Sequence, residues 1–515
     1  MAVLASKGTA SVTLAIGATL NVLAGGQGVA VLKGGAYKGQ SVELGASVRK
    51  IGPFPFAMPI TINSQSGALT YYVGADSAAP HVEIAGEYDA ATGNPVLDDA
   101  SRAAVQAVRV VSLPARAQAL IPGVPVIISG GRAQLGCDPV TLVPMDPRAG
   151  ATQYYVDITN GNDANNGSTW ALAFKSIYKA TQAGNAAAVP YTVNIAAGWY
   201  PRANGFSNNG AGVTPTQSCV FRGIGGQVIC HTGNALTWAL DSGTTYSTAR
   251  SNTKRVLDLV AFDADGDYSE LTLAASLAAC RAAPGTWYSD GTTLYVNRTD
   301  GAVVSDANTL ALLTTISGII GTNSGNMHLF NITQMGGSSG CFQIQNNTTG
   351  KTYAENCKFN FSTSSTYIDN VVGLDSALVV MNKCVAAKSQ KDGFNYHNGG
   401  SVAPKAVHID CIGYGNGVVT TSNSNNGATI HDAGVMLDLN GRYFKNYGGD
   451  YAHANASTIA VGVCTQTYGS YGDLDRPSGI TRPGSGFVAL SGSTIYKYDC
   501  VGADQVDGGG SIITA

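Results

Sequence analysis

Short apolar runs recur along the second half of the chain at a nearly constant spacing. Cys357, Cys384 and Cys411 lie 27 residues apart, and each stands inside such a run (TYAENCKFNF, LVVMNKCVAA and AVHIDCIGYG). A repeat of this length is typical of a solenoid, in which each coil buries its apolar face only against its neighbours. Steps of 26 or 27 residues extend the series to Phe330, Leu437, Cys464 and Leu490. We therefore predict one inward-facing stack along the axis of a β-solenoid.

The hydrophobic pattern divides the rest of the chain into three parts. Residues 1–75 alternate apolar and polar positions between Gly-rich turns, which predicts a small β module. Residues 76–150 combine a candidate helix at 98–111 with a Pro-punctuated stretch, and we interpret them as a neck or linker. Residues 151–515 form the predicted solenoid, with its earliest coils at 192–200 and 217–229. Asp290-Gly291 stands between two apolar runs and predicts a hairpin there.

Composition supports turn-rich β structure and narrows the function. Charged residues make up 12% of the chain, and 65 of its 515 residues are Gly; Gly is favoured in turns. The net charge of −3 gives no indication of nucleic-acid binding, and no apolar run is long enough for membrane insertion. The ten cysteines include no CxxC pair, so we predict reduced thiols, no metal site and no cofactor.

Polar residues also recur at a 27-residue step, which suggests a ligand-binding face. Asp369, Tyr396, Asn423 and Asp450 follow this step, with His397 and His453 beside them. Residues one coil apart lie about 4.7–4.9 Å apart along the axis. The sequence therefore predicts a polar column suited to a carbohydrate. In the alternative interpretation, Asn, Asp and Gly only form the turns between coils.

Candidate chemistry follows from the carboxylates in this region. Glycoside hydrolysis needs two carboxyl groups about 5–5.5 Å or 6.5–9.5 Å apart. The candidates are Asp392, Asp432 and Asp450, with His397, His431 and His453 as proton shuttles or partners of sugar hydroxyls. A lyase would place a base opposite Arg or Lys. Since few of these occur here, mainly Lys388, Lys391 and Arg442, hydrolysis is favoured over lyase chemistry.

Residues 153–183 (QYYVDITNGNDANNGSTWALAFKSIYKATQA) carry the most specific motif. A strand, an Asn/Gly/Asp turn cluster and an amphipathic helix from near Ala171 are predicted, with Phe174, Ile177, Tyr178 and Thr181 on one helix face. This motif resembles the beginning of right-handed parallel β-helix proteins of the pectate-lyase-like superfamily, in which the helix plugs the open first coil. Asp157 and Asp163 in the turn cluster could suggest calcium, but the set lacks the acidic spacing of a calcium loop, which favours a turn.

Residues 48–73 (VRKIGPFPFAMPITINSQSGALTYYV) resemble an N-terminal β-sandwich-like element of phage fibre proteins. Together the two resemblances imply a phage tailspike or fibre-type virion protein. Its expected parts are a virion-attachment module, a neck and a right-handed parallel β-helix. Such spikes are usually homotrimers, bind other virion proteins through the N-terminal module, and are assembled in the bacterial host cytoplasm. The implied function is recognition of host surface polysaccharide. Two alternatives stay open: a depolymerase, or a non-catalytic decoration or adhesion fibre on the tail or capsid.

Overall fold

The computed structural model describes the strands of residues 1–75 and residues 109–515, except 147–149, 151, 208–209, 211, 324, 367, 418–424 and 469–485. The chain forms two compact units, one of Met1–Arg109 with Ile128–Gly131 and one of Val110–Ile127 with Arg132–Ala515. Most of the helix predicted over 98–111 lies outside the described residues; Arg109–Val110 form a short strand, β9. No helix in the described part of the chain is long and apolar enough to cross a membrane.

The described strands of residues 1–75 form two antiparallel four-stranded sheets. Their order is β1-β8-β3-β6 in one sheet and β2-β7-β4-β5 in the other. The strands are β1 (Ala2–Leu4), β2 (Thr9–Leu14), β3 (Ala18–Ala24), β4 (Gln27–Leu32), β5 (Ser41–Leu44), β6 (Arg49–Ile51), β7 (Met58–Ser66) and β8 (Leu69–Ala75). These strands follow the alternating segments of the sequence, while the attachment role of the module stays a prediction.

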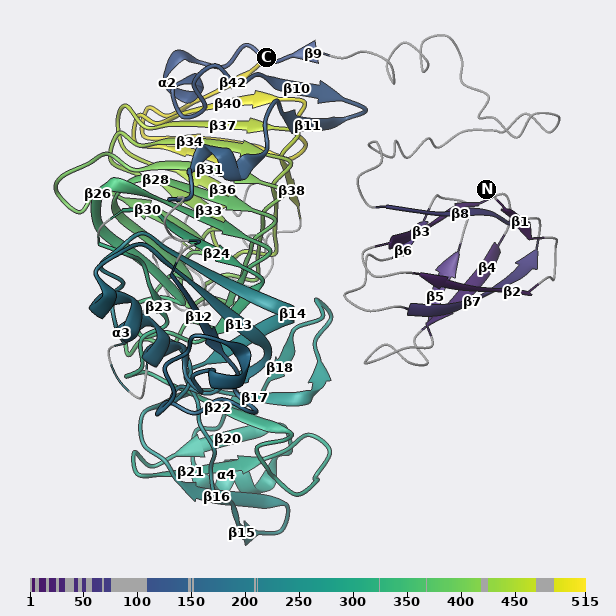
Figure 1. The fold of residues 1–515 in the computed structure, drawn as a ribbon, viewed down its shortest axis with the longest axis vertical. Helices are drawn as coiled ribbons and strands as arrows, with labels where there is room; N and C mark the ends of the chain where they lie inside the picture. The colour runs from purple at the N-terminus through teal and green to yellow at the C-terminus, as the bar shows by residue number, and fades with distance from the viewer. Residues whose placement is uncertain are drawn as a thin grey trace. The chain divides into compact units, whose positions relative to one another are not determined.

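The second unit is a parallel β-helix, in which successive coils add one strand to each of three parallel sheets (Figure 1). Sheet 1 contains β12 (Gln153–Val156), the first parts of β13 (Tyr191–Tyr200) and β14 (Cys219–His231), β24 (Met327–Phe330), the last parts of β26 (Phe342–Glu355) and β28 (Val371–Asn382), β31 (Lys405–Ile409), β34 (Val435–Leu439), β37 (Ile459–Val463), β40 (Thr494–Tyr498) and β42 (Ser511–Thr514).

The other two sheets are built in the same way from the remaining strands of each coil. Sheet 2 contains the last parts of β13 and β14, then β25 (Ile332–Met335), β27 (Lys358–Asn360), β29 (Val385–Ala387), β32 (Ile412–Tyr414), β35 (Arg442–Phe444) and β38 (Gln466–Tyr468). Sheet 3 contains β23 (Ile319–Ile320), the first parts of β26 and β28, then β30 (Phe394–His397), β33 (Ala428–Ile430), β36 (Tyr451–His453), β39 (Phe487–Leu490) and β41 (Asp504–Asp507).

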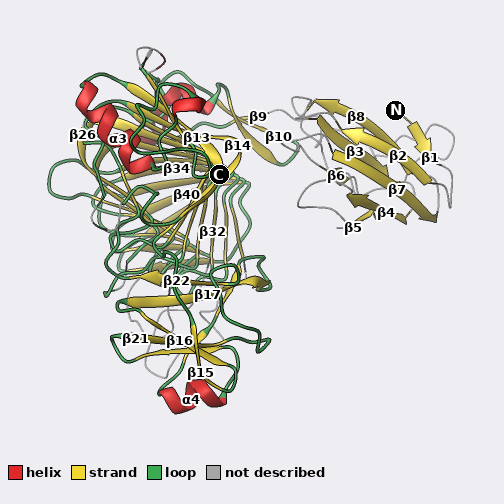
Figure 2. Cartoon of the chain, turned by 60° about the horizontal axis from the view of Figure 1, so that its bottom comes forward, coloured by secondary structure: helices red, strands yellow, loops and turns green. Residues whose placement is uncertain are grey.

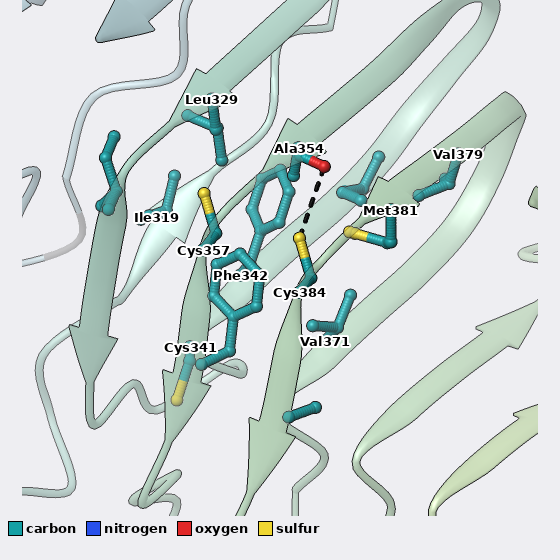
Figure 3. Packing of buried hydrophobic residues seen from close by; sticks show 14 of the residues in the cluster. Ile319, Leu329, Cys341, Phe342, Ala354, Cys357, Val371, Val379, Met381 and Cys384 are labelled. Atoms are coloured by element: carbon teal, nitrogen blue, oxygen red, sulfur yellow. Dashed lines mark hydrogen bonds between the residues drawn. The ribbon is translucent and has the colours of Figure 1, made fainter. Parts of the chain in front are cut away.

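Cys357, Cys384 and Cys411 lie at equivalent positions of successive coils, as the spacing predicts. All three are buried in the continuous apolar core of the β-helix, where Cys384 lies close to Phe342 and Met381 (Figure 3). The thiol of Cys384 donates to the carbonyl oxygen of Ala354 at 3.3 Å, one coil earlier. Burial raises the pKa of Cys384 well above its ordinary value. These cysteines are therefore packing residues; all ten cysteines of the chain are free thiols.

The extension of this stack to Phe330, Leu437, Cys464 and Leu490 is wrong. The pairing register places Phe330 opposite Glu355, and Leu490 belongs to sheet 3. The residues equivalent to the three cysteines are Ile332, Gly441, Thr465 and Cys500. The coils from Ile332 to Cys500 are therefore 25, 27, 27, 30, 24 and 35 residues long. A fixed step follows the register only while the turns between strands keep one length.

The first coil is covered by helix α3 (Ile177–Ala187), which packs on β12 and β13 (Figure 2). The helix begins six residues later than predicted from Ala171, because the Ser176 side chain accepts the Lys179 N–H and caps it. The segment before it contains a short 3₁₀ turn, η4 (Trp170–Leu172). Asp163 accepts the backbone N–H of Ser176 at 2.9 Å, so this carboxylate anchors the turn.

An insertion between β14 and β23 forms two small sheets outside the coil. Its hairpin at Asp290-Gly291 is confirmed, and Asp290 accepts the N–H groups of Thr292 and Thr293. The elements are β15 (Ala239–Ser242), β16 (Thr245–Ala249), β17 (Thr253–Phe262), β18 (Tyr268–Glu270), β19 (Thr272–Leu273), α4 (Leu277–Ala282), β20 (Thr286–Ser289), β21 (Thr293–Asn297) and β22 (Thr309–Leu313). Lys358 and Lys445 of the β-helix form ion pairs with Asp267 and Asp265 of this insertion.

A strap, defined as Val110–Ile127 and residues 132–146, runs along the β-helix from its last coils toward its first. Tyr498 donates to the Ser112 carbonyl at 2.8 Å, Asn440 donates to Ala133 at 2.9 Å, and the His328 ring lies 2.7 Å from the Val143 carbonyl. The elements here are α2 (Ala115–Gln118), the first half of β10 (Val126–Ser129), β11 (Arg132–Leu135) and η2 (Pro139–Leu142). The segment predicted as a neck thus includes residues that bind the side of the solenoid.

Candidate functional site

The polar column predicted from a 27-residue step is wrong in register. The coils of sheet 3 from β28 to β39 are 23, 34, 23 and 36 residues long. As a result Asp369 lies one coil below Asp392, whereas Tyr396 belongs to a different position in the coil. Asn423 lies outside the described residues.

Asp369 and Asp392 form part of a turn-supporting ladder. Asp369 accepts the backbone N–H of Asp392 at 2.9 Å and the side-chain amide of Asn395 at 2.9 Å. Asp392 in turn accepts the N–H of Asn426 in the next coil at 2.7 Å. Asp392 is fully buried and Asp369 nearly so. The side chains therefore hold successive coils together, as the alternative interpretation of the sequence expects of such residues.

Asp450 and His453 are also buried completely. Burial raises the pKa of Asp450 to about 8, so the carboxyl group is protonated at neutral pH. It lies 2.8 Å from the amide nitrogen of Asn446. The Nδ1 atom of His453 accepts the N–H of Ile430 at 3.1 Å, and burial lowers the pKa of this histidine well below its ordinary value. Both groups face protein rather than solvent.

Tyr396 belongs to a buried polar network inside the core. Its hydroxyl lies 2.8 Å from Nε2 of His408, and Nδ1 of His408 lies 3.0 Å from the hydroxyl of Tyr443. Tyr443 donates to Asp438 at 2.8 Å, and Thr465 donates to the other oxygen of that carboxyl group at 2.5 Å. All five side chains are fully or almost fully buried. Tyr396 therefore acts in this network and does not reach a ligand on the surface.

His397, His431 and Asp432 do come together at the surface, at the end of β30 and just after β33. The rings of His397 and His431 stack with centroids 4.1 Å apart and planes 8° apart. The Nδ1 atom of His397 lies 3.3 Å from Oδ2 of Asp432, which also accepts the N–H of Asn398 at 3.1 Å. The side chains of His397 and Asp432 are 32% and 35% exposed. We call these three residues the imidazole–carboxylate cluster.

The backbone explains why this cluster forms. His397 and His431 occupy equivalent outward positions of successive coils, while their neighbours Tyr396 and Ile430 face the core. Asp432 follows with a left-handed φ of 57°, a conformation that Asp and Asn tolerate better than most residues. Asn455 stands near it in the next coil, and its side chain lies 3.3 Å from Nδ1 of His431.

The surroundings of the cluster favour the neutral form of the His431 ring. Burial, and next the nearby His397, lower the pKa of His431 to about 4, so His431 is neutral at pH 7. Its Nε2 atom is buried without a hydrogen-bond partner among the described residues. One coil below Asn398, Asp375 accepts three N–H groups, from Gly399, Ser401 and Val402, which lower its pKa. Asp375 therefore anchors the turn beside the cluster as a carboxylate.

Of the three predicted catalytic residues, Asp432 has a side chain exposed to solvent, whereas Asp392 and Asp450 are buried. The cluster is partly exposed and can accept and donate hydrogen bonds, which suits contact with sugar hydroxyls. Among the described residues, no group of His, Cys, Asp and Glu side chains has an arrangement that could hold a metal ion. Sequence reasoning missed Asp375 and Asn455, although both are Asp or Asn at corner positions with positive φ.

Comparisons with known proteins give likenesses of fold only. No protein-family description matches the sequence, and no curated protein matches it. Solved structures with a similar chain path include a glycoside hydrolase, with a TM-score of 0.40, 10% identity, and coverage of 70% of this chain and 96% of that chain. XylC in complex with xylose gives a TM-score of 0.42 at 10% identity, covering 71% and 70% of the two chains. The tailspike protein gp49 of Pseudomonas phage LKA1 gives 0.20 at 11% identity, covering 62% and 64%. The identification of the fold rests on the strand register described above.

Proposed function

We propose that this chain is a virion spike or fibre protein that recognises host surface polysaccharide through the imidazole–carboxylate cluster. The observation that carries the proposal is the partly exposed pair of His397 and Asp432 beside the stacked ring of His431. A carboxylate accepts hydrogen bonds from sugar hydroxyls, and a neutral imidazole both donates and accepts them.

Recognition fits the geometry better than hydrolysis. A hydrolase needs a second carboxyl group within about 5–10 Å on the substrate side. Asp392 and Asp450 are fully buried. Asp375, two coils from Asp432, is almost completely buried, and its Oδ1 atom accepts three backbone N–H groups. Glycoside hydrolysis stays the second candidate, favoured by the exposure of Asp432 next to an ionisable ring.

The virion location, the homotrimer and the attachment role of residues 1–75 belong to the same proposal. The resemblance of residues 48–73 to phage fibre modules supports them, as does the low charge of a long β-helix whose flanks a trimer would cover. Light scattering of the full chain tests the assembly. A mass three times 52.7 kDa is expected, and a monomeric mass would overturn the trimer.

The function is tested by binding of purified capsular polysaccharide or O-antigen to the full chain. Asp432→Asn removes the charge while keeping a residue that tolerates positive φ. Loss of one charge-assisted hydrogen bond, worth about 1.5–3 kcal/mol, should weaken binding roughly ten- to hundredfold. Asp499→Asn is the matched control, because Asp499 also has a positive φ of 51° and lies at a different corner.

The same incubation separates the two candidates. New reducing ends that disappear in Asp432→Asn would support a hydrolase, while binding without release supports the non-catalytic fibre. If no host surface polysaccharide binds to the wild type, or if Asp432→Asn binds as well as Asp499→Asn, the proposed site is refuted. Equal melting temperatures of the two variants would show that the fold is intact.

A further inference from the structure

A small cavity opens directly beside the imidazole–carboxylate cluster. Its volume is about 170 Å³, far more than the ~10–15 Å³ that one water needs. The strap forms one wall and the turns before β31 and β34 form the other. The lining residues are Arg116, Ala119, Leu120, Ala403, Pro404, Lys405, Ala433 and Val435. Ala433 follows Asp432 directly, so the cavity and the cluster share one turn.

The cavity combines two cations with apolar walls. Arg116 donates to the backbone carbonyl oxygens of Ser457 and Ala433, which fixes the guanidinium, and no carboxylate of the described residues pairs with its charge. Lys405 is exposed, and no ion pair or side-chain hydrogen bond involves it within the described residues. The carboxylate of Asp432 is not part of the lining, and its Oδ2 atom contacts His397 and the Asn398 N–H. The two charged residues of the lining are therefore both cations.

The apolar part of the lining limits the class of ligand that the cavity can bind. Leu120, Pro404 and Val435 are buried residues that offer C–H surface to a ligand in the cavity. A free inorganic anion gains nothing from such a wall, whereas a sugar ring with a carboxylate substituent contacts both the wall and the cations. Pockets for whole drug-sized ligands are about 300–1,000 Å³. The cavity has room for one sugar ring rather than an oligosaccharide.

We propose that this cavity is a subsite for a carboxylate-bearing sugar, such as a uronic acid, with Lys405 and Arg116 holding the carboxylate. The inference rests on the proposed function, since it adds the substrate class, an acidic polysaccharide, to the same surface. The neighbouring residues of the glycan would then lie over His397 and His431. Nothing in the sequence brings Arg116 to this place, because it lies 317 residues from Ala433.

The test uses methyl β-D-glucuronide and its uncharged methyl ester with the full chain. Binding is followed by saturation-transfer NMR and calorimetry at low and high salt. We expect the acid to bind at least tenfold more tightly than the ester. The variant Lys405→Gln should remove this difference, while the control Lys175→Gln, an exposed lysine near the first coil, keeps it. Raising the salt concentration should weaken binding of the acid only.

Several outcomes would overturn the subsite. These are equal affinity for the acid and the ester, no detectable binding of the acid, an unchanged acid preference in Lys405→Gln, or inorganic phosphate binding as tightly as the glucuronide. The result is separable from the test of the proposed function. Polysaccharide binding that depends on Asp432, with no preference for the acid, refutes only the subsite. Lys405-dependent binding of the glucuronide with no polysaccharide binding refutes only the proposed function.

Discussion

Asp438→Asn should make the β-helix more stable relative to wild type as the pH rises. Asp438 is fully buried and accepts hydrogen bonds from Tyr443, Thr465 and the Gly441 N–H. Burial raises its pKa from 3.8 to about 7. An asparagine has nearly the same shape. It can donate to the Tyr443 oxygen and still accept from Thr465 and Gly441, so that Tyr443 can donate to His408 instead.

The sign follows from proton linkage. Since the folded state holds the Asp438 proton more tightly than the unfolded state, its contribution is fully present below about pH 3.8 and is lost as the pH rises to about 7. Three pH units at ~1.36 kcal/mol each give about 4 kcal/mol. Burial of His408 acts in the opposite direction. It lowers the pKa from 6.5 to about 3, so that contribution is lost as the pH falls below 6.5.

Asp438 and His408 therefore contribute opposing dependences between about pH 4 and 6.5, and the variant loses the contribution of Asp438. The stability of Asp438→Asn relative to wild type should rise by about 4 kcal/mol between pH 4 and pH 7.5. With an unfolding entropy of ~2.1 cal/mol/K per residue, this corresponds to roughly 4 °C in melting temperature. Calorimetry across this range, with Asp499→Asn as the control, measures it. If the difference in stability between Asp438→Asn and wild type does not change with pH, the raised pKa of Asp438 is refuted.

Three further changes test the packing. Cys384→Ala removes a buried thiol that contacts Ala354 and should cost about 1–2 kcal/mol in thermal unfolding, whereas Cys137→Ala, which is partly exposed, should cost little; equal effects would contradict the packing role. Gly427→Ala places a Cβ 2.6 Å from the Asp450 carbonyl oxygen and should cost about 1–3 kcal/mol, while Gly210→Ala, which meets no atom within 4 Å, is its control. Replacing Lys445 by Met breaks its ion pair with Asp265 and should increase proteolysis of the insertion; unchanged cleavage would argue against this brace.

The class of fold could be predicted from local signals in the sequence. The strand after Gln153, the turn cluster and the apolar runs around Cys357, Cys384 and Cys411 depend on neighbours within one coil. The sequence predicts the start of helix α3 six residues too early, because Phe174 follows the helical spacing but precedes the cap at Ser176. Local pattern alone does not distinguish a buried residue before a helix from one inside it.

The candidate site could be predicted only in part, because a constant step does not hold between coils of different length. The sequence places His397, His431 and Asp432 in one region, and in the structure their side chains are in contact. Asp392 and Asp450 lie in similar Asn-, Asp- and Gly-rich segments of the sequence, but both side chains are buried and support the turns and the core. The contact of Arg116 with Ala433 depends on the path of the strap. The two residues are 317 positions apart, and no local sequence pattern predicts a contact over that separation.

The strap changes how the coils depend on one another. A solenoid is ordinarily a chain of nearest-neighbour interactions, so its terminal coils can fray while the middle stays folded. Here Ser112 is bound to the coil of Tyr498, Ala133 to that of Asn440, and Val143 to that of His328. Opening the last coil must therefore loosen a segment that is also fastened to the first ones. We expect the strap to suppress local opening along the whole β-helix. Hydrogen exchange in β40 and in β24 should therefore accelerate together in Tyr498→Phe, which removes the hydrogen bond to Ser112.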